Sequence, residues 1–146
     1  MLNLRKSIFA ILTISLFSFN LLLAEDIGKI FTKAEADQLF GPVLESKTMS
    51  TAQLQELSIK TNRNIMFLLK NNQITILGDS RKLIYSSDKF TDENQVFHLY
   101  SLSKVVELIY KAGKDTVQFE NRKDVFTITS GEYTLEVAAP CPPYCG

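Results

Sequence analysis

Residues 64–86 read NIMFLLKNNQITILGDSRKLIYS and contain three apolar runs separated by two polar turns. The first turn is Asn71-Asn72 and the second begins at Gly78; asparagine and glycine are typical of the tight turns that join antiparallel strands. The runs are rich in Ile, Leu, Phe and Tyr, which favour strands. We therefore predict a three-stranded antiparallel meander with strands at residues 64–70, 73–77 and 82–86.

A helix is predicted immediately before this meander. Ser50 and Gln53 have the spacing of a capping box, in which a side chain binds a first-turn amide, and apolar residues recur at helical spacing up to about residue 62. Residues 43–49 are expected to be extended. A shorter helix is predicted within residues 31–42, because Thr32 begins a T-x-x-E capping box and Gly41-Pro42 ends the pattern.

The same order of elements recurs towards the C-terminus. Residues 95–100 are expected to be extended, Ser101 to cap a helix that Gly113 ends, and three strands to follow at residues 116–120, 125–129 and 133–138. The two segments align without a gap at an offset of 51 residues, with caps, turns and apolar positions in phase. We predict an α+β fold of two helix-plus-meander pseudo-repeats, about residues 43–87 and 94–138, that share one core.

This helix-plus-three-strand unit resembles, in topology alone, the small modules of PepSY-type domains and of tandem-repeat secreted inhibitors of β-lactamase type. The resemblance implies protein binding and involves no shared motif residues.

Residues 1–24 have the pattern of a secretory signal peptide. Arg5 and Lys6 precede an apolar run at residues 7–23, and Ala24 is a small residue before an acidic pair. We predict export to the periplasm or the extracellular space, with cleavage after Ala24. The alternative is an uncleaved anchor, since an apolar helix of about 18 residues nearly spans a bilayer core. Contact with a membrane is expected only in that case.

The expected mature domain, residues 25–138, is nearly neutral. The whole chain has 16 basic and 16 acidic residues, and removal of Arg5 and Lys6 with the signal leaves 14 basic against 16 acidic ones. Nucleic-acid binding requires a basic excess that is absent here, so we expect no nucleic-acid partner. The length suffices for one domain with a real core.

Residues 139–146, APCPPYCG, form a Cys- and Pro-rich tail. In an exported protein with no other cysteine, Cys141 and Cys145 are predicted to form a disulfide. A thiol-redox function is the alternative, because the tail resembles the C-P-Y-C of glutaredoxins with one proline inserted. A metal site would need further ligands, for which the single histidine, His98, is the candidate.

An enzyme active site is not expected. Gly78-Asp79-Ser80 resembles the nucleophile block of GDSL-type esterases, and Ser101 with Lys104 fits the S-x-x-K of penicillin-binding enzymes, but the other motifs of both families are missing. A small hydrolase that uses Ser80 or Ser101 is the remaining enzymatic hypothesis. We assign no catalytic residue and expect no cofactor.

The function predicted from the sequence is therefore an exported, non-enzymatic module that binds another protein or a cell-envelope component. The candidate contact residues are Tyr85, Phe90 and Tyr144, because an aromatic side chain in a polar loop or tail is a common interface anchor.

Overall fold

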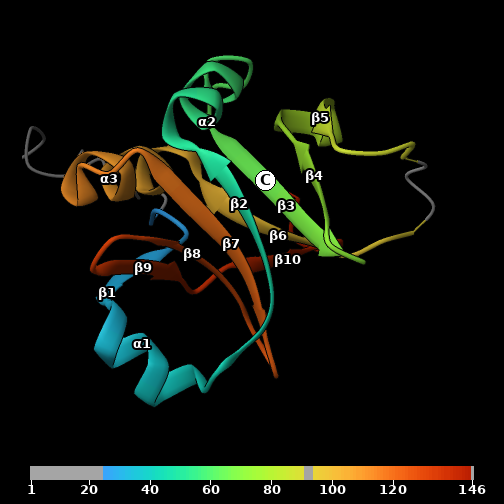
Figure 1. Cartoon of the computed structure of the whole chain (residues 1–146). Helices are drawn as coiled ribbons and strands as arrows, with labels where there is room; N and C mark the ends of the chain where they lie inside the picture. Colours follow the sequence, from blue (N-terminus) through green and yellow to red (C-terminus); the bar gives the residue numbers. More distant parts are fainter. Residues whose placement is uncertain (1–24, 91–93, 146) are drawn as a thin grey trace, which may run out of the picture.

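The computed structural model describes residues 25–90 and 94–145, so the predicted signal peptide lies outside the described residues. Over these ranges the chain forms an α+β fold with three α-helices and two antiparallel sheets of five strands each (Figure 1). The helices are α1 (Lys33–Phe40), α2 (Thr51–Ser58) and α3 (Leu102–Ala112). A 3-10 turn, η1, spans Asp79–Arg81.

The two sheets have distinct strand orders. The first, which we call sheet A, has the order β1-β9-β8-β7-β2, and the second, sheet B, has the order β10-β6-β3-β4-β5. The strands of sheet A are β1 (Lys29–Thr32), β2 (Val43–Ser50), β7 (Thr116–Arg122), β8 (Phe126–Ser130) and β9 (Tyr133–Glu136). Those of sheet B are β3 (Asn64–Lys70), β4 (Gln73–Leu77), β5 (Leu83–Ser86), β6 (Phe97–Ser101) and β10 (Ala139–Cys141).

Both predicted meanders are confirmed, since β3, β4 and β5 pair in order, as do β7, β8 and β9. The extended segment before each meander, however, pairs in the other sheet. β2 precedes the first meander and pairs with β7, with Met49 opposite Val117, whereas β6 precedes the second and pairs with β3. The short edge strands β1 and β10 are not predicted from the sequence. They form by pairing with β9 and β6, which are distant in the sequence.

One cluster of buried side chains contains residues of both sheets and of α2 and α3. At its centre, the Phe67 ring on β3 lies 5.2 Å from the Phe119 ring on β7 and 6.0 Å from the Phe126 ring on β8. Asn121 joins the sheets by a polar contact, because its side-chain amide donates to the Leu69 carbonyl at 2.8 Å. The helical members of the cluster are Leu54, Leu57, Val105, Leu108 and Ile109.

The opposite face of sheet A carries a buried polar network. Glu120 accepts hydrogen bonds at 2.9 Å from the hydroxyls of Thr127 and Thr129 and at 3.1 Å from Arg122. Arg122 also forms an ion pair with Asp37 of α1, at 2.9 Å. This network attaches α1 to sheet A, at the end of the molecule opposite α2 (Figure 1).

The helix boundaries follow the predicted caps with two corrections. The capping box of Thr32 and Glu35 is present, and α3 ends at Gly113 in the left-handed conformation, as expected. α2 ends at Ser58, earlier than predicted. Ser101 precedes α3, but its side chain makes no capping bond; its hydroxyl accepts from the Ile27 amide at 2.8 Å instead. The N-terminal segment, distant in sequence, thus competes with the helix for this hydroxyl.

Within residues 25–90 and 94–145, none of the helices has both the length and the apolar character needed to cross a bilayer.

Candidate functional site

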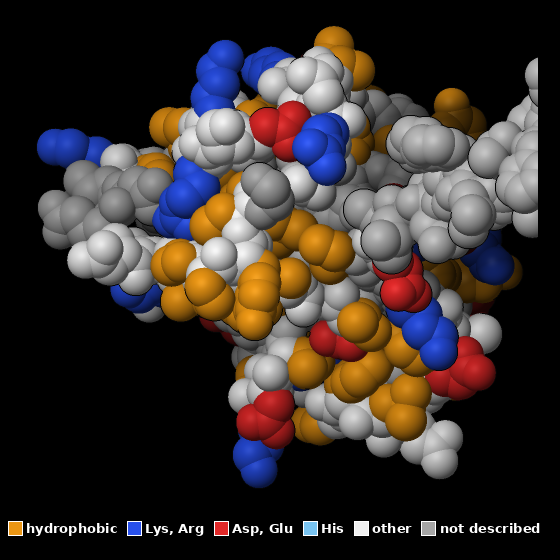
Figure 2. Space-filling view, turned by 180° about the vertical axis from the view of Figure 1, so that it is seen from behind, with side chains coloured by type: hydrophobic (Ala, Val, Ile, Leu, Met, Phe, Trp, Pro, Cys, Tyr) orange, Lys and Arg blue, Asp and Glu red, His pale blue; other side chains and the backbone are white. Residues whose placement is uncertain are grey.

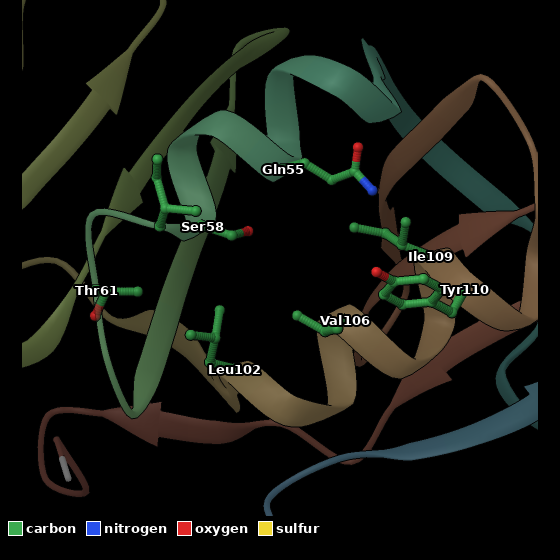
Figure 3. Close-up of a pocket in the computed structure, with 8 residues that line it drawn as sticks. Gln55, Ser58, Thr61, Leu102, Val106, Ile109 and Tyr110 are labelled. Atoms are coloured by element: carbon green, nitrogen blue, oxygen red, sulfur yellow. The ribbon is translucent and has the colours of Figure 1, made fainter.

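An apolar groove of about 330 Å³ lies between α2 and α3 (Figure 3). Leu102, Val106 and Ile109 point into it from α3, while Gln55 and Ser58 face it from α2. The apolar residues of α3 form this wall. Val105 and Leu108 are buried in the core, whereas Val106 stays at the surface and lines the groove. The full lining consists of Gln55, Ser58, Ile59, Thr61, Leu102, Val106, Ile109 and Tyr110.

Two large apolar side chains at the rim of this groove are exposed to an unusual degree. Ile59, directly after α2, is 83% exposed, and Tyr110 on α3 is 79% exposed. Both are the most exposed large hydrophobic residues in the described part of the chain. Apolar side chains gather in patches on the face seen from behind (Figure 2). Ile59 and Tyr110 flank a concave surface, and hydrophobic grooves of this kind bind ligands or partners.

The serine and threonine hydroxyls of the groove are already hydrogen-bonded within the protein. Ser58 donates to the Leu54 carbonyl at 2.7 Å, and Thr61 donates to the Asn64 carbonyl at 2.8 Å and accepts from the Asp79 amide at 2.9 Å. These two residues therefore present mainly methyl and methylene groups to an occupant. A groove of this composition favours an apolar ligand surface, because a polar one would lose hydrogen bonds to water without replacing them.

The three aromatic residues predicted as contacts do not share one surface. Tyr85 is half-buried and packs against the main core, whereas Phe90 packs edge-on against Phe97, with ring centroids 5.7 Å apart, on the outer face of sheet B. Tyr144 is 65% exposed in the tail. Tyr110 is not among the contact residues predicted from the sequence, although an aromatic residue on α3 outside its buried stripe is a signal of an exposed anchor.

The predicted disulfide between Cys141 and Cys145 is present. Its first cysteine ends β10 and is fully buried in a second, smaller hydrophobic cluster on the outer face of sheet B. Arg81 of η1 lies against it: Nη1 donates to the Cys141 carbonyl at 2.9 Å and to Cys141 Sγ at 3.1 Å. The tail is therefore held to sheet B by strand pairing, apolar packing and one guanidinium group.

His98 lies on the other face of sheet B from the cysteines. Pro140 is its partner in β10, and Cys141 pairs with Phe97, so the side chains of His98 and Cys141 point to opposite faces. The imidazole stacks on the Phe126 ring at 4.8 Å, and burial lowers the pKa of His98. Within residues 25–90 and 94–145, no three potential ligands from His, Cys, Asp and Glu form a group that could hold a metal ion.

The two serines of the hydrolase hypothesis lie apart from the imidazole. Ser101 is on β6 three positions from His98, on the opposite face, and its hydroxyl accepts from Ile27. Ser80 is exposed and lies in η1 with a φ of 57°. The structure thus brings neither serine next to His98.

Asp79, beside Ser80, binds backbone amides of the loop that follows α2. Its carboxylate accepts from the backbone amides of Asn62, Arg63 and Asn64 at 2.9–3.1 Å and so fixes the loop that follows α2. Burial acts to raise the pKa of Asp79, but these amide donors outweigh it, and the pKa is held below its ordinary value.

A pH dependence of stability follows from this carboxylate. A lowered pKa in the folded state means that the stabilisation is complete above the unfolded pKa, about 4, and is lost as pH falls through the folded value. Asp79→Asn is expected to cost about 1–3 kcal/mol at pH 7. Urea denaturation from pH 7 to pH 2 should show this difference shrinking below about pH 4. A difference that stays constant with pH would contradict the assignment.

We compared the chain with known families, curated proteins and solved structures. No family model, no curated protein and no solved structure matches it.

Proposed function

We propose that this protein is an exported, non-enzymatic module that binds the apolar face of a helix in another protein through the α2–α3 groove. The observation that carries the proposal is the pair Ile59 and Tyr110, exposed on either side of a concave apolar surface. An amphipathic helix laid into a groove buries such anchors and makes few polar contacts of its own. The engaged hydroxyls of Ser58 and Thr61 suit this occupant.

Export is part of this proposal and depends on the sequence of residues 1–24. The disulfide of the tail supports it, because such bonds persist in oxidising compartments and are rare in the cytosol. Intact-mass measurement of protein recovered from the cell envelope or the medium tests it. We expect a chain that begins at Glu25; a full-length chain in the cytosolic fraction would contradict export.

We also propose that the segments at about residues 43–87 and 94–138 are pseudo-repeats around a shared core. The repeated order of strand, helix and three strands supports this proposal, as does one buried cluster with members from both segments. The first strand of each segment also pairs with the meander of the other segment: β2 pairs with β7, and β6 pairs with β3. This reciprocal pairing relates the two segments symmetrically. A single melting transition common to the two segments tests the shared core.

The groove proposal predicts which substitutions weaken partner binding. Tyr110→Ala is expected to weaken it about 30-fold, the effect of removing an anchor worth about 2 kcal/mol. Ile59→Ser should act in the same direction. The matched control is Leu83→Ala on β5, an exposed apolar residue outside the groove. Affinity is measured by titration with the envelope protein that photo-crosslinks to a probe placed at position 110.

Two results would contradict this assignment. One is a partner whose affinity falls with Tyr144→Ala or Leu83→Ala and is unchanged by Tyr110→Ala. The other is concentration-dependent dimerisation, seen by analytical ultracentrifugation and abolished by Tyr110→Ala. That result would make a second copy of this chain the occupant of the groove, in place of another protein.

A further inference from the structure

We infer that the Cys141–Cys145 disulfide is a thiol-exchange site, at which an external aliphatic thiolate attacks Cys145 and releases Cys141 as a thiolate beside Arg81. The inference is independent of the groove proposal, because the tail packs on the outer face of sheet B and lines no part of the α2–α3 groove.

The two sulfur atoms differ in access. Cys141 is 0% exposed, whereas Cys145 is partly exposed and follows three exposed residues, Pro142, Pro143 and Tyr144. An attacking thiolate must approach one sulfur in line with the bond to the other. Of the two cysteines, only Cys145 has surface exposed to solvent, so we assign the attack to Cys145. The buried sulfur of Cys141 is then the leaving group.

Arg81 is placed at the sulfur that departs. Its Nη1 lies 3.1 Å from Cys141 Sγ, and the guanidinium group is 5.1 Å from the centre of the Phe97 ring. Its Nη2 donates to the Gln95 carbonyl at 3.2 Å, which fixes the plane of the group. A fixed cation stabilises the thiolate form of a cysteine, and a thiol that ionises more readily leaves faster. Burial of Cys141 disfavours its thiolate form. The Arg81 guanidinium group is therefore the feature that makes departure of the Cys141 thiolate favourable.

The backbone at Ser80 and Arg81 has an uncommon left-handed conformation that fits the position of the guanidinium group. Ser80 and Arg81 have φ values of 57° and 58°, and two consecutive side-chain-bearing residues in the left-handed region are uncommon. Conformations of this kind cost energy and occur where the surrounding structure holds a group in a required position. Here the turn directs the guanidinium group towards the tail.

The exchange balances as two successive displacements. The external thiolate forms a mixed disulfide with Cys145, the Cys141–Cys145 bond breaks, and its electron pair stays on Cys141. Cys141 can return to Cys145 and expel the external thiolate, or a second external thiolate can attack the mixed disulfide. The second route yields the external disulfide and both protein thiols, so two thiols are oxidised for each protein disulfide reduced. Pairing of β10 with β6 keeps Cys141 in place throughout.

The test uses the full mature protein with two probes, reduced glutathione and a peptide with one cysteine. Samples are quenched with acid and analysed by mass spectrometry. We expect mixed disulfides at Cys145 and not at Cys141. Reaction with glutathione alone would assign a small-molecule thiol, and reaction with both probes would extend the site to protein thiols.

Variants of Arg81 test the role of the guanidinium group. Arg81→Gln is expected to slow the first displacement about 3- to 10-fold, the effect of a less stabilised leaving thiolate. Arg81→Lys, which keeps the cation, should restore part of the rate. The matched control is Arg63→Gln, which removes an arginine side chain at an exposed position outside the tail. Thermal melting of each oxidised variant shows that the fold is intact.

Three results would overturn the inference. The first is a mixed disulfide at Cys141, which would reverse the direction of attack. The second is an exchange rate that rises in Arg81→Gln, because Arg81 would then only shield the bond. The third is a folded protein that forms no adduct with either probe unless it is first denatured. That result would make the disulfide solely a structural link.

Discussion

Phe67→Ala is expected to lower the free energy of unfolding by about 3–5 kcal/mol, and to do so for both sheets at once. The Phe67 ring is fully buried and lies at the junction of the two sheets, tilted against Phe119 and stacked near Phe126. Its removal leaves a cavity that the surrounding strands fill only in part. A loss of this size is a large fraction of the 5–15 kcal/mol that stabilises a typical domain.

The measurement is differential scanning calorimetry combined with urea denaturation. We expect one transition with equal calorimetric and van't Hoff enthalpies in the unmodified protein, and one transition at lower temperature in the variant. Tyr144→Ala is the control, since it removes an exposed aromatic ring and should change stability by less than about 0.5 kcal/mol. Two separate transitions, of which Phe67→Ala moves one, would contradict a core shared by the two segments.

Arg122→Ala is expected to cost about 3–5 kcal/mol, because it leaves the buried carboxylate of Glu120 without its cation. Arg122 is 4% exposed and Glu120 is 2% exposed, so water cannot readily replace the missing charge. The substitution also removes the ion pair with Asp37 and the hydrogen bond to the Gly41 carbonyl, which attach α1 to sheet A.

A second substitution separates the loss of the charge from the loss of contacts. In the double variant Glu120→Gln, Arg122→Met the unpaired charge is absent, so it should recover part of the stability that Arg122→Ala loses. Lys123→Ala, at the next and exposed position, is the matched control. Urea denaturation measures all four proteins. Equal stability of Arg122→Ala and Lys123→Ala would show that the buried network contributes little.

The local elements of the fold could be predicted because their signals lie within a few residues of one another. The capping box of Thr32 and Glu35, the glycine at position 113 and the turn at Asn71-Asn72 depend on neighbours in sequence, and each is found where predicted. Ser101 shows where prediction from neighbouring residues fails. Its hydroxyl could serve α3 or any other donor, and Ile27, 74 positions away, binds it.

The candidate site was much less predictable than the fold. The polar surroundings of Tyr85, Phe90 and Tyr144 in the sequence predict exposed contacts, but the first two pack against core clusters. Tyr110 lies outside the apolar stripe of α3, but the sequence does not show that α2 lies beside this helix and forms a groove with it. Arg81 likewise has no sequence signal that relates it to Cys141, since 60 residues separate the two.

The sequence by itself determined the α+β class, the two meanders and the cysteine pair, because local propensity, turn chemistry and close spacing suffice for each. Only the tertiary structure decided that β2 pairs with β7 and β6 with β3, that Glu120 and Arg122 form a buried network, and that α2 and α3 leave a groove between them. The physical reason is that strand pairing and burial depend on which distant surfaces meet. A strand carries the same hydrogen-bonding groups along both edges, so its own residues do not specify its neighbour.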